Sequence, residues 1–237
     1  MLSITNLTKV YKGGKVAVKD LSLTVSAGDI YGFIGHNGAG KTTTLKCIAG
    51  IIDFEQGDIT VNGKSVKLDP VGVKSDIAYI PDNPDIYEYL TGIQYLNFIS
   101  DVYNVGKQER VETIQKLAKL FGIDDVLGNL VSSYSHGMKQ KLVLISAFVH
   151  KPKLMILDEP FVGLDPKASY DVKEIMQEFV KGGGAIFFST HVLDTAEKLC
   201  NKVAIIRDGE IVLSGETQAL VGDKSLEKVF LENVIND

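Results

Sequence analysis

Apolar and polar residues alternate along two stretches near the start of the chain, residues 2–10 and 17–25, and again along residues 58–66. Such alternation is typical of strands with one buried face. Asn62 and Gly63 interrupt the third stretch, and this pair favours a tight turn between two strands. We therefore expect the N-terminal part of the chain to form antiparallel strands.

The periodicity becomes helical between residues 87 and 149. Apolar residues spaced three or four apart predict one helix face that carries Val111, Ile114, Leu117, Ala118 and Phe121. Thr91 is a suitable N-cap for a preceding helix. We expect this segment to be a helical insertion between two sheet-forming halves.

After the insertion, short apolar runs alternate with helical patterns. The runs cover residues 153–157, 185–189 and 203–206, and the helical patterns cover residues 167–180 and 192–200. This alternation indicates a buried, largely parallel sheet with crossover helices, and therefore an α/β fold. Asp208 and Gly209 then turn the chain into a further strand, and residues 225–233 predict a terminal helix.

Composition and charge narrow the class of protein. The chain has 237 residues, of which 45% are hydrophobic, so we expect one domain with an insertion. The net charge is -5 with both signs interspersed, which argues against nucleic acid as a partner. Cys47 and Cys200 are expected to be buried free thiols. No apolar stretch approaches the roughly 20 residues that span a bilayer, and no signal peptide is visible, so we expect a cytosolic protein.

The strongest motif is the glycine-rich stretch at residues 35–42, which fills every fixed position of the pattern G-x-x-x-x-G-K-[ST]. Residues 29–34 predict a strand that enters this loop, and residues 43–52 predict a helix that leaves it. Glycines let backbone N–H groups curl around phosphate oxygens, and the helix N-terminus adds partial positive charge. We predict a nucleoside triphosphate site formed by Asn37, Gly38, Ala39, Gly40, Lys41, Thr42 and Thr43.

The predicted site also needs groups that bind magnesium and activate water. Lys41 should reach the β- and γ-phosphates, and the Thr42 hydroxyl should ligate a magnesium ion. A buried strand at residues 154–157 delivers Asp158 and Glu159 to the crevice where ligands of open α/β sheets bind. Asp158 should support magnesium, and Glu159 is placed where a general base would act on water. The alternative is a strand that ends in a solvated acidic pair.

With these motifs in this order, the chain resembles the nucleotide-binding subunits of ATP-binding cassette transporters over residues 2–215. The Walker A loop matches residues 35–42 and the Walker B strand residues 154–159. The signature motif matches residues 134–138, the D-loop residues 163–165, and the switch histidine His191. Variants in these motifs look like the exporter-type bacterial subfamily, whose ATPase is a separate polypeptide.

The resemblance implies roles for residues outside the Walker motifs. Two such domains pair head to tail in the family, so Ser135 and Gly137 would face the γ-phosphate held by the partner's Walker A loop. His191 would hydrogen-bond the γ-phosphate, Tyr11 would stack on adenine, and Asp165 would make a contact across the dimer. The last three residues also have plainer alternatives. His191 would be a structural histidine, Tyr11 an ordinary strand tyrosine and Asp165 a helix N-cap.

The chain departs from the family pattern at two places. The signature reads Tyr-Ser-His-Gly-Met rather than Leu-Ser-Gly-Gly-Gln, and Asp82 stands where the Q-loop glutamine is expected. Asp82 would either ligate magnesium through water or serve only the coupling loop. Residues 82–90 also hold an apolar and aromatic cluster, which marks a docking site for a membrane partner or packs against the helical insertion. The cluster comprises Pro84, Ile86, Tyr87, Tyr89 and Leu90.

The resemblance implies one ATP-binding cassette domain over residues 1–237, built on a P-loop NTPase core. We expect this core at residues 1–82 and 151–215, a helical signature subdomain at residues 83–150, and a short C-terminal helical tail at residues 216–237.

The resemblance implies that the chain binds ATP and Mg²⁺, hydrolyses ATP, forms a homo- or heterodimer, and powers a separate integral membrane permease for export. It would then lie at the inner face of the cell membrane. The alternatives are a soluble cassette ATPase that acts on ribosomes or DNA, or a P-loop kinase. Soluble cassette ATPases of that class usually carry two cassettes in one chain or a long coiled-coil insertion, and neither is visible in this sequence. A kinase would not need the signature motif or His191.

Overall fold

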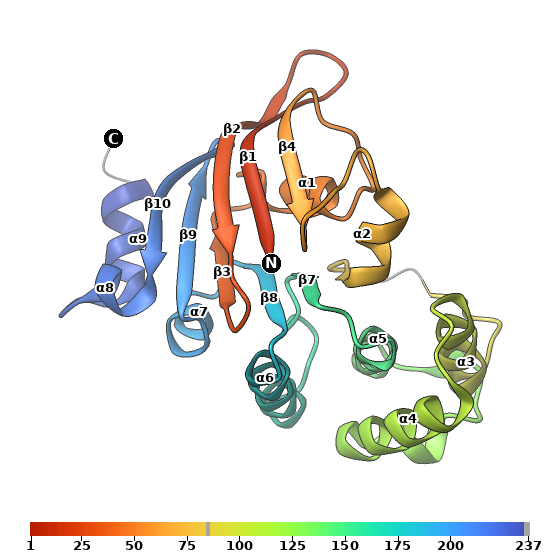
Figure 1. The fold of residues 1–237 in the computed structure, drawn as a ribbon. Helices are drawn as coiled ribbons and strands as arrows, with labels where there is room; N and C mark the ends of the chain where they lie inside the picture. Colours follow the sequence, from red (N-terminus) through yellow and green to blue (C-terminus); the bar gives the residue numbers. More distant parts are fainter. Residues whose placement is uncertain (84–85, 235–237) are drawn as a thin grey trace. The chain divides into compact units, whose positions relative to one another are not determined.

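The computed structural model describes residues 1–83 and 86–234 (Figure 1). The chain divides into two compact units. The first unit comprises Met1–Tyr79, Lys153–Pro160 and Met176–Asp237, and the second comprises Ile80–Pro152 and Phe161–Ile175. The domain boundaries expected from the sequence stay a prediction.

The first unit begins with an antiparallel sheet whose strands run in the order β2-β1-β4-β5. Its strands are β1 (Leu2–Val10), β2 (Val16–Val25), β4 (Gln56–Val61) and β5 (Lys64–Ser65). Asn62 and Gly63 both have positive φ, 51° and 79°, as a two-residue hairpin turn of type I′ requires. The predicted antiparallel strands are therefore confirmed, and the tight turn lies where the sequence placed it.

A second sheet, with strand order β10-β9-β3-β8-β7-β6, carries the loops of the site. Its strands are β3 (Ile30–Ile34), β6 (Ile77–Ile80), β7 (Leu154–Asp158), β8 (Ala185–Thr190), β9 (Lys202–Arg207) and β10 (Glu210–Glu216). Strands β7, β8, β3 and β9 are parallel, whereas β10 pairs with β9 in the antiparallel direction. Every residue of β3, β7 and β8 is buried, which confirms the predicted buried, largely parallel sheet.

Strand register brings the predicted motifs to one edge of this sheet. Ile34, the last residue of β3, pairs with Thr190 of β8, and Ser189 of β8 pairs with Asp158 of β7. The chain therefore leaves β3 and β7 at neighbouring positions, with the end of β8 between them. Ligands of open α/β sheets bind at this kind of edge.

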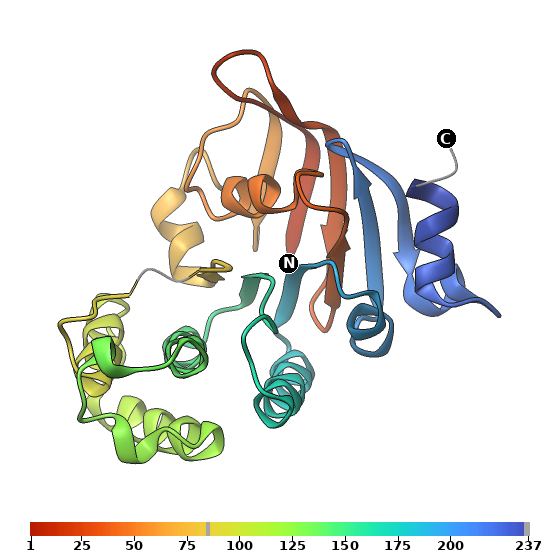
Figure 2. The same ribbon diagram turned by 180° about the vertical axis from the view of Figure 1, so that it is seen from behind.

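The first unit contains several helices, of which α1 bears on the site. They are α1 (Lys41–Ile48), α2 (Pro70–Asp76), α7 (Leu193–Leu199), α8 (Thr217–Val221) and α9 (Leu226–Val234). Apolar residues of α1 belong to one core cluster with residues of both sheets, and Figure 2 shows the helix against the strands. Helices α8 and α9 lie beside β10 (Figures 1 and 2).

Two sequence expectations in this unit need correction. The helix predicted at residues 43–52 spans Lys41–Ile48 instead. It ends early because Gly50 adopts a left-handed conformation, with φ 61°, and the Ile51 N–H bonds back to the Lys46 carbonyl. Helix α2 and strand β6 were not predicted.

The second unit is helical. It contains α3 (Gly92–Val102), α4 (Lys107–Phe121), α5 (His136–Val149), the start of α6 (Pro166–Lys181), and 3₁₀ turns at Asp124–Val126 and Val131–Ser133. Thr91 caps α3 through a capping box with Gln94, as predicted. Four of the five residues predicted to form the apolar face of α4 are buried, whereas Val111 is 48% exposed. In the described residues, no helix combines the length and apolarity needed to cross a membrane.

Candidate active site

The glycine-rich loop connects β3 to α1, and two of its glycines have no room for a side chain. Gly40 has φ 111°, and a Cβ there would lie 2.5 Å from the carbonyl oxygen of Ala17. A Cβ on Gly35 would lie 2.5 Å from the carbonyl oxygen of Ile206. Both clashes are with backbone atoms, so neighbouring strands fix the path of the loop.

Lys41 lies inside the curve of this loop and is only 7% exposed. Its Nζ donates to the carbonyl oxygens of Gly35 at 2.7 Å and His36 at 3.3 Å. It also lies 3.8 Å from Glu159 Oε1. Burial lowers the pKa of Lys41, while the carboxylates of Glu159 and Asp158 act in the opposite direction. The structure thus holds a buried cation among acceptors that phosphate oxygens are able to replace.

Thr42 and Asp158 are the residues that would hold magnesium. Thr42 is exposed in the first turn of α1, directly after Lys41, and Asp158 is 2% exposed at the end of β7. The charge of Asp158 acts on Lys41, so the carboxylate is close to the loop. One hydroxyl and one carboxylate suit magnesium, which keeps several waters and shares phosphate oxygens with its substrate. The residues present therefore fit a magnesium–triphosphate group.

Ser189, which was not predicted from the sequence, connects Asp158 and Glu159. Ser189 Oγ donates to Asp158 Oδ1 at 2.5 Å and accepts the Glu159 N–H at 3.1 Å. Ser189 is fully buried and lies opposite Asp158 in the pairing of β7 with β8. Its side chain therefore fixes Asp158 and the backbone at Glu159 together.

Glu159 and His191 form the outer part of the cluster. Glu159 adopts φ 49°, a left-handed conformation that is uncommon for a residue with a side chain. Its Oε1 lies 3.0 Å from His191 Nδ1. At this distance Nδ1, when protonated, donates to the carboxylate, which only accepts hydrogen bonds. The structure thus brings together Lys41, Asp158, Glu159 and His191, four of the predicted site residues.

Tyr11 follows the last residue of β1 and lies beside the start of α1. Its hydroxyl is 3.3 Å from the Thr43 hydroxyl, and the residue is 41% exposed. An exposed aromatic ring next to the first turn of the helix is suitably placed for a base attached to the phosphates. The structure therefore brings Tyr11 to the same site as the glycine-rich loop.

The predicted signature residues lie in the second unit, at the start of α5. Ser135 is the N-cap of this helix, where its Oγ accepts the Met138 N–H at 3.3 Å, and it is exposed. A Cβ on Gly137 would lie 3.1 Å from the carbonyl oxygen of Gly163, so this residue packs closely on the D-loop. The N-terminus of a long helix is a favourable place for an anion.

Asp165 and Asp82 also belong to the second unit. Asp165 Oδ1 accepts the Ala168 N–H at 2.8 Å at the start of α6, as a helix cap does. This hydrogen bond, together with Lys141 at 3.4 Å, holds the pKa of Asp165 below its usual value. Asp82 is exposed in a bend.

The model of the family described as ABC transporter matches residues 18–162 of this chain. The chain belongs to the ABC transporter family. It is an ATP-binding subunit that hydrolyses ATP with Mg²⁺. It is 38% identical to the ABC-type transporter ATP-binding protein EcsA of Bacillus subtilis, an alignment that covers 98% of this chain and 96% of EcsA.

Solved structures agree with this assignment. An ATP-binding subunit of an ABC transporter is 32% identical, with a TM-score of 0.93 and coverage of 98% of each chain. A dimeric ATP-binding cassette in a post-hydrolysis state, bound to ADP and Pi, has a TM-score of 0.83 at 20% identity and covers 92% of this chain and 99% of that one. The latter likeness shows the fold of the cassette.

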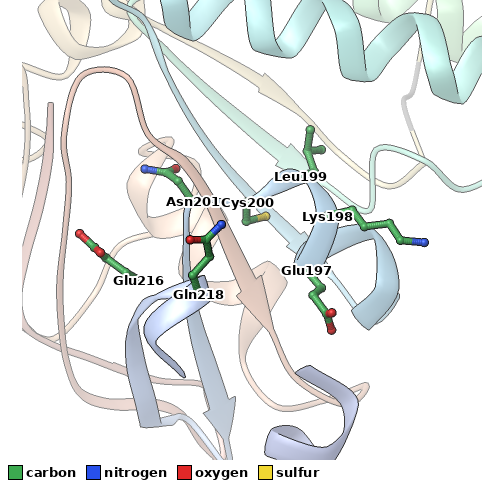
Figure 3. A pocket seen from close by; sticks show the side chains of 7 residues that line it. All are labelled: Glu197, Lys198, Leu199, Cys200, Asn201, Glu216 and Gln218. Atoms are coloured by element: carbon green, nitrogen blue, oxygen red, sulfur yellow. The ribbon is translucent and has the colours of Figure 1, made fainter. Parts of the chain in front are cut away.

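A cavity of about 480 Å³ lies elsewhere in the first unit, at the C-terminal end of α7 (Figure 3). It is lined by Glu197, Lys198, Leu199, Cys200, Asn201, Glu216 and Gln218. Asn201 directly precedes β9, whereas Ile206 near the other end of that strand touches the glycine-rich loop. The cavity therefore lies at the end of β9 that is opposite to the glycine-rich loop.

Proposed function

We propose that this ATPase subunit dimerises head to tail across two ATP molecules and powers a separate membrane permease in export. The observation that carries the proposal is the cluster of Lys41, Asp158, Glu159 and His191 at one sheet edge, which supplies half of a hydrolytic site. The exposed N-terminus of α5, with Ser135 and Gly137, supplies the other half for a partner subunit. A solved cassette of the same fold is dimeric, which supports dimerisation.

Each residue of the first half-site then has a role. Lys41 binds the β- and γ-phosphates, Thr42 and Asp158 hold magnesium, and Tyr11 stacks on the base. Magnesium, when bound, neutralises charge on the phosphates. Glu159 accepts the proton of the attacking water. His191 holds the Glu159 carboxylate through Nδ1 and leaves Nε2 for the γ-phosphate.

The remaining phosphate contacts come from the loop and from the partner subunit. Backbone N–H groups of residues 37–43 surround the phosphates in the subunit that binds them. Ser135 and Gly137 approach the γ-phosphate of the partner, and Asp165 contacts the partner while it caps α6. Asp82 as a magnesium ligand through water, or as part of the coupling loop, stays a prediction.

For the permease, we propose an aromatic surface on the second unit formed by Tyr87, Tyr89 and Phe98. Tyr87 and Tyr89 are 46% and 73% exposed, and the Tyr87 ring lies 5.5 Å from that of Phe98. Ile86 of the cluster expected from the sequence is 7% exposed, so it is buried and does not belong to this surface. Pro84 lies outside the described residues. Exposed aromatic side chains are enriched at protein interfaces.

Dimerisation is tested in a Glu159→Gln background. This variant should bind ATP but turn it over about 10²- to 10⁴-fold more slowly, so the ATP-bound dimer should accumulate in size-exclusion chromatography. Adding Ser135→Arg should abolish the dimer and leave ATP binding by the monomer intact, whereas Ser26→Arg, in an exposed turn of the first unit, should do neither. A dimer that survives Ser135→Arg would refute the head-to-tail arrangement.

Docking is tested by fractionation of cells that express the subunit with its permease. Tyr89→Glu should release the subunit from membranes without loss of ATP binding, while Tyr170→Glu, at a 62% exposed tyrosine of the same unit, should not. A Tyr89→Glu variant that still sediments with membranes would contradict the docking surface. Sedimentation of the wild type with ribosomes would instead favour the soluble class of cassette ATPase.

A further inference from the structure

Glu55 makes three bonds to the end of β1, just before Tyr11. Its backbone N–H donates to the Thr8 carbonyl at 3.1 Å. Its Oε2 accepts the Val10 N–H at 2.6 Å, and its Oε1 accepts from Lys9 Nζ at 2.8 Å. One residue from the loop before β4 thus holds three consecutive positions of β1 that lead to Tyr11.

Lys9 connects this clamp to the ring of Tyr11. Its Nζ lies 5.6 Å from the centroid of the Tyr11 ring, within the range of a cation–π contact. Lys9 is 9% exposed, so its ammonium depends on Glu55 for compensation. The hydrogen bond that Lys9 Nζ donates to Glu55 Oε1 keeps Lys9 charged, since it raises the pKa of Lys9.

The other contacts of Tyr11 fix its backbone and its hydroxyl. Its N–H donates to the Lys15 carbonyl at 2.9 Å, and its hydroxyl lies 3.3 Å from Thr43 Oγ1. The ammonium of Lys9 lies over one face of the ring, and Tyr11 is 41% exposed, so part of the ring is accessible to an aromatic ligand. A ring held at both ends and on one face is pre-organised for stacking, which reduces the entropy lost on binding.

We infer that Glu55 is a positioning residue for the base of the nucleotide, which acts through Val10 and Lys9 on the ring of Tyr11. This inference rests on the proposed stacking role of Tyr11. Glu55 itself contacts no phosphate-loop residue in the bonds described above. Its effect should therefore fall on recognition of the base and not on recognition of the phosphates.

The test compares two ligands, Mg-ATP and magnesium tripolyphosphate, which has the phosphates but no base. Tyr11→Ala should weaken ATP binding about 10-fold, because base–aromatic stacking contributes of that order. Glu55→Ala should weaken it about 3- to 5-fold, and neither variant should change tripolyphosphate affinity by more than about twofold. The double variant should bind ATP no more weakly than Tyr11→Ala alone, because both changes act on one ring.

Two further variants separate positioning from general damage. Glu55→Gln retains an acceptor for the Val10 N–H but loses the charge beside Lys9, so its ATP affinity should fall between those of wild type and Glu55→Ala. Glu232→Ala, in α9, removes a surface ion pair with Lys224 and should bind both ligands as wild type does. If Glu55→Ala does not fold, Glu55→Gln with the same two ligands provides the test.

Three results would overturn the inference. Equal weakening of ATP and tripolyphosphate by the Glu55 variants would show a general structural role. Unchanged ATP affinity in the Glu55 variants, with the expected loss in Tyr11→Ala, would remove Glu55 alone from base recognition. Unchanged ATP affinity in Tyr11→Ala would refute the stacking role itself, and with it the proposed function of Tyr11.

Discussion

Replacement of Ser189 by alanine removes the hydroxyl that joins Asp158 to the backbone of Glu159. Asp158 loses a donor at 2.5 Å, and the Glu159 N–H loses an acceptor at 3.1 Å. The Glu159 N–H keeps a second acceptor, the Ser189 carbonyl oxygen at 3.2 Å. The main loss is therefore the hydrogen bond to the buried carboxylate of Asp158.

The size of both effects follows from this geometry. A hydrogen bond to a charged group contributes about 1.5–3 kcal/mol, so we expect Ser189→Ala to lower the free energy of unfolding by about that amount. Glu159 would also lose part of its restraint, and a displacement of about 1 Å in a site can cost about 10²-fold in rate. We therefore expect kcat to fall about 10- to 100-fold. ATP affinity should stay within about threefold of wild type, because Lys41 and the loop keep their contacts.

Urea unfolding, steady-state hydrolysis and titration with Mg-ATP measure these three quantities. Ser146→Ala is the matched control, since Ser146 is a 6% exposed serine whose Oγ donates to the Val143 carbonyl in the second unit. It should lose some stability and keep its turnover. If Ser189→Ala hydrolyses ATP within threefold of wild type, or loses affinity by the same factor as turnover, Ser189 does not position the carboxylates.

Three other variants test the site and its support. Gly40→Ala should bind ATP poorly and unfold at lower urea, because its Cβ would lie 2.5 Å from the Ala17 carbonyl oxygen; wild-type affinity would show that the loop adapts. Lys41→Ala should weaken ATP binding about 30-fold, because a charge-assisted bond to phosphate contributes about 2 kcal/mol, and calorimetry showing less than threefold would contradict this role. Burial raises the pKa of Asp76, but hydrogen bonds from Lys64 and Lys153 outweigh it and lower the pKa from 3.8. Its contribution to stability is present above pH 3.8 and lost below it, so Asp76→Asn should be less stable at pH 7 and approach wild type at pH 3; a pH-independent difference would refute the assignment.

The sequence predicted best those features whose signals are local. Thr91 lies at the N-cap of α3, as predicted, because capping is decided within four residues. Helix α2 has equally local signals that were overlooked: Asp69 accepts the Gly72 N–H at 2.9 Å, and Pro70 occupies the first helical position.

Ser189 could not be found in this way, because its two partners come from another strand. Asp158 lies 31 residues earlier in the chain, and only the pairing of β7 with β8 brings the two side chains together. The same holds for Glu55, which is 45 residues from Val10. Polar residues that support a site across strands carry no periodic pattern, since their role depends on register.

The contacts of Lys41 connect phosphate binding to the surroundings of the Glu159 carboxylate. Lys41 Nζ donates to two carbonyl oxygens and lies 3.8 Å from Glu159 Oε1. A cation at this distance attracts the carboxylate and so restrains the side chain of Glu159. Under the proposed roles, the γ-phosphate takes over the ammonium of Lys41 and adds negative charge beside Glu159. The Glu159 carboxylate is then released from Lys41 and, with His191 Nδ1 beside it, is able to accept a hydrogen bond from the attacking water.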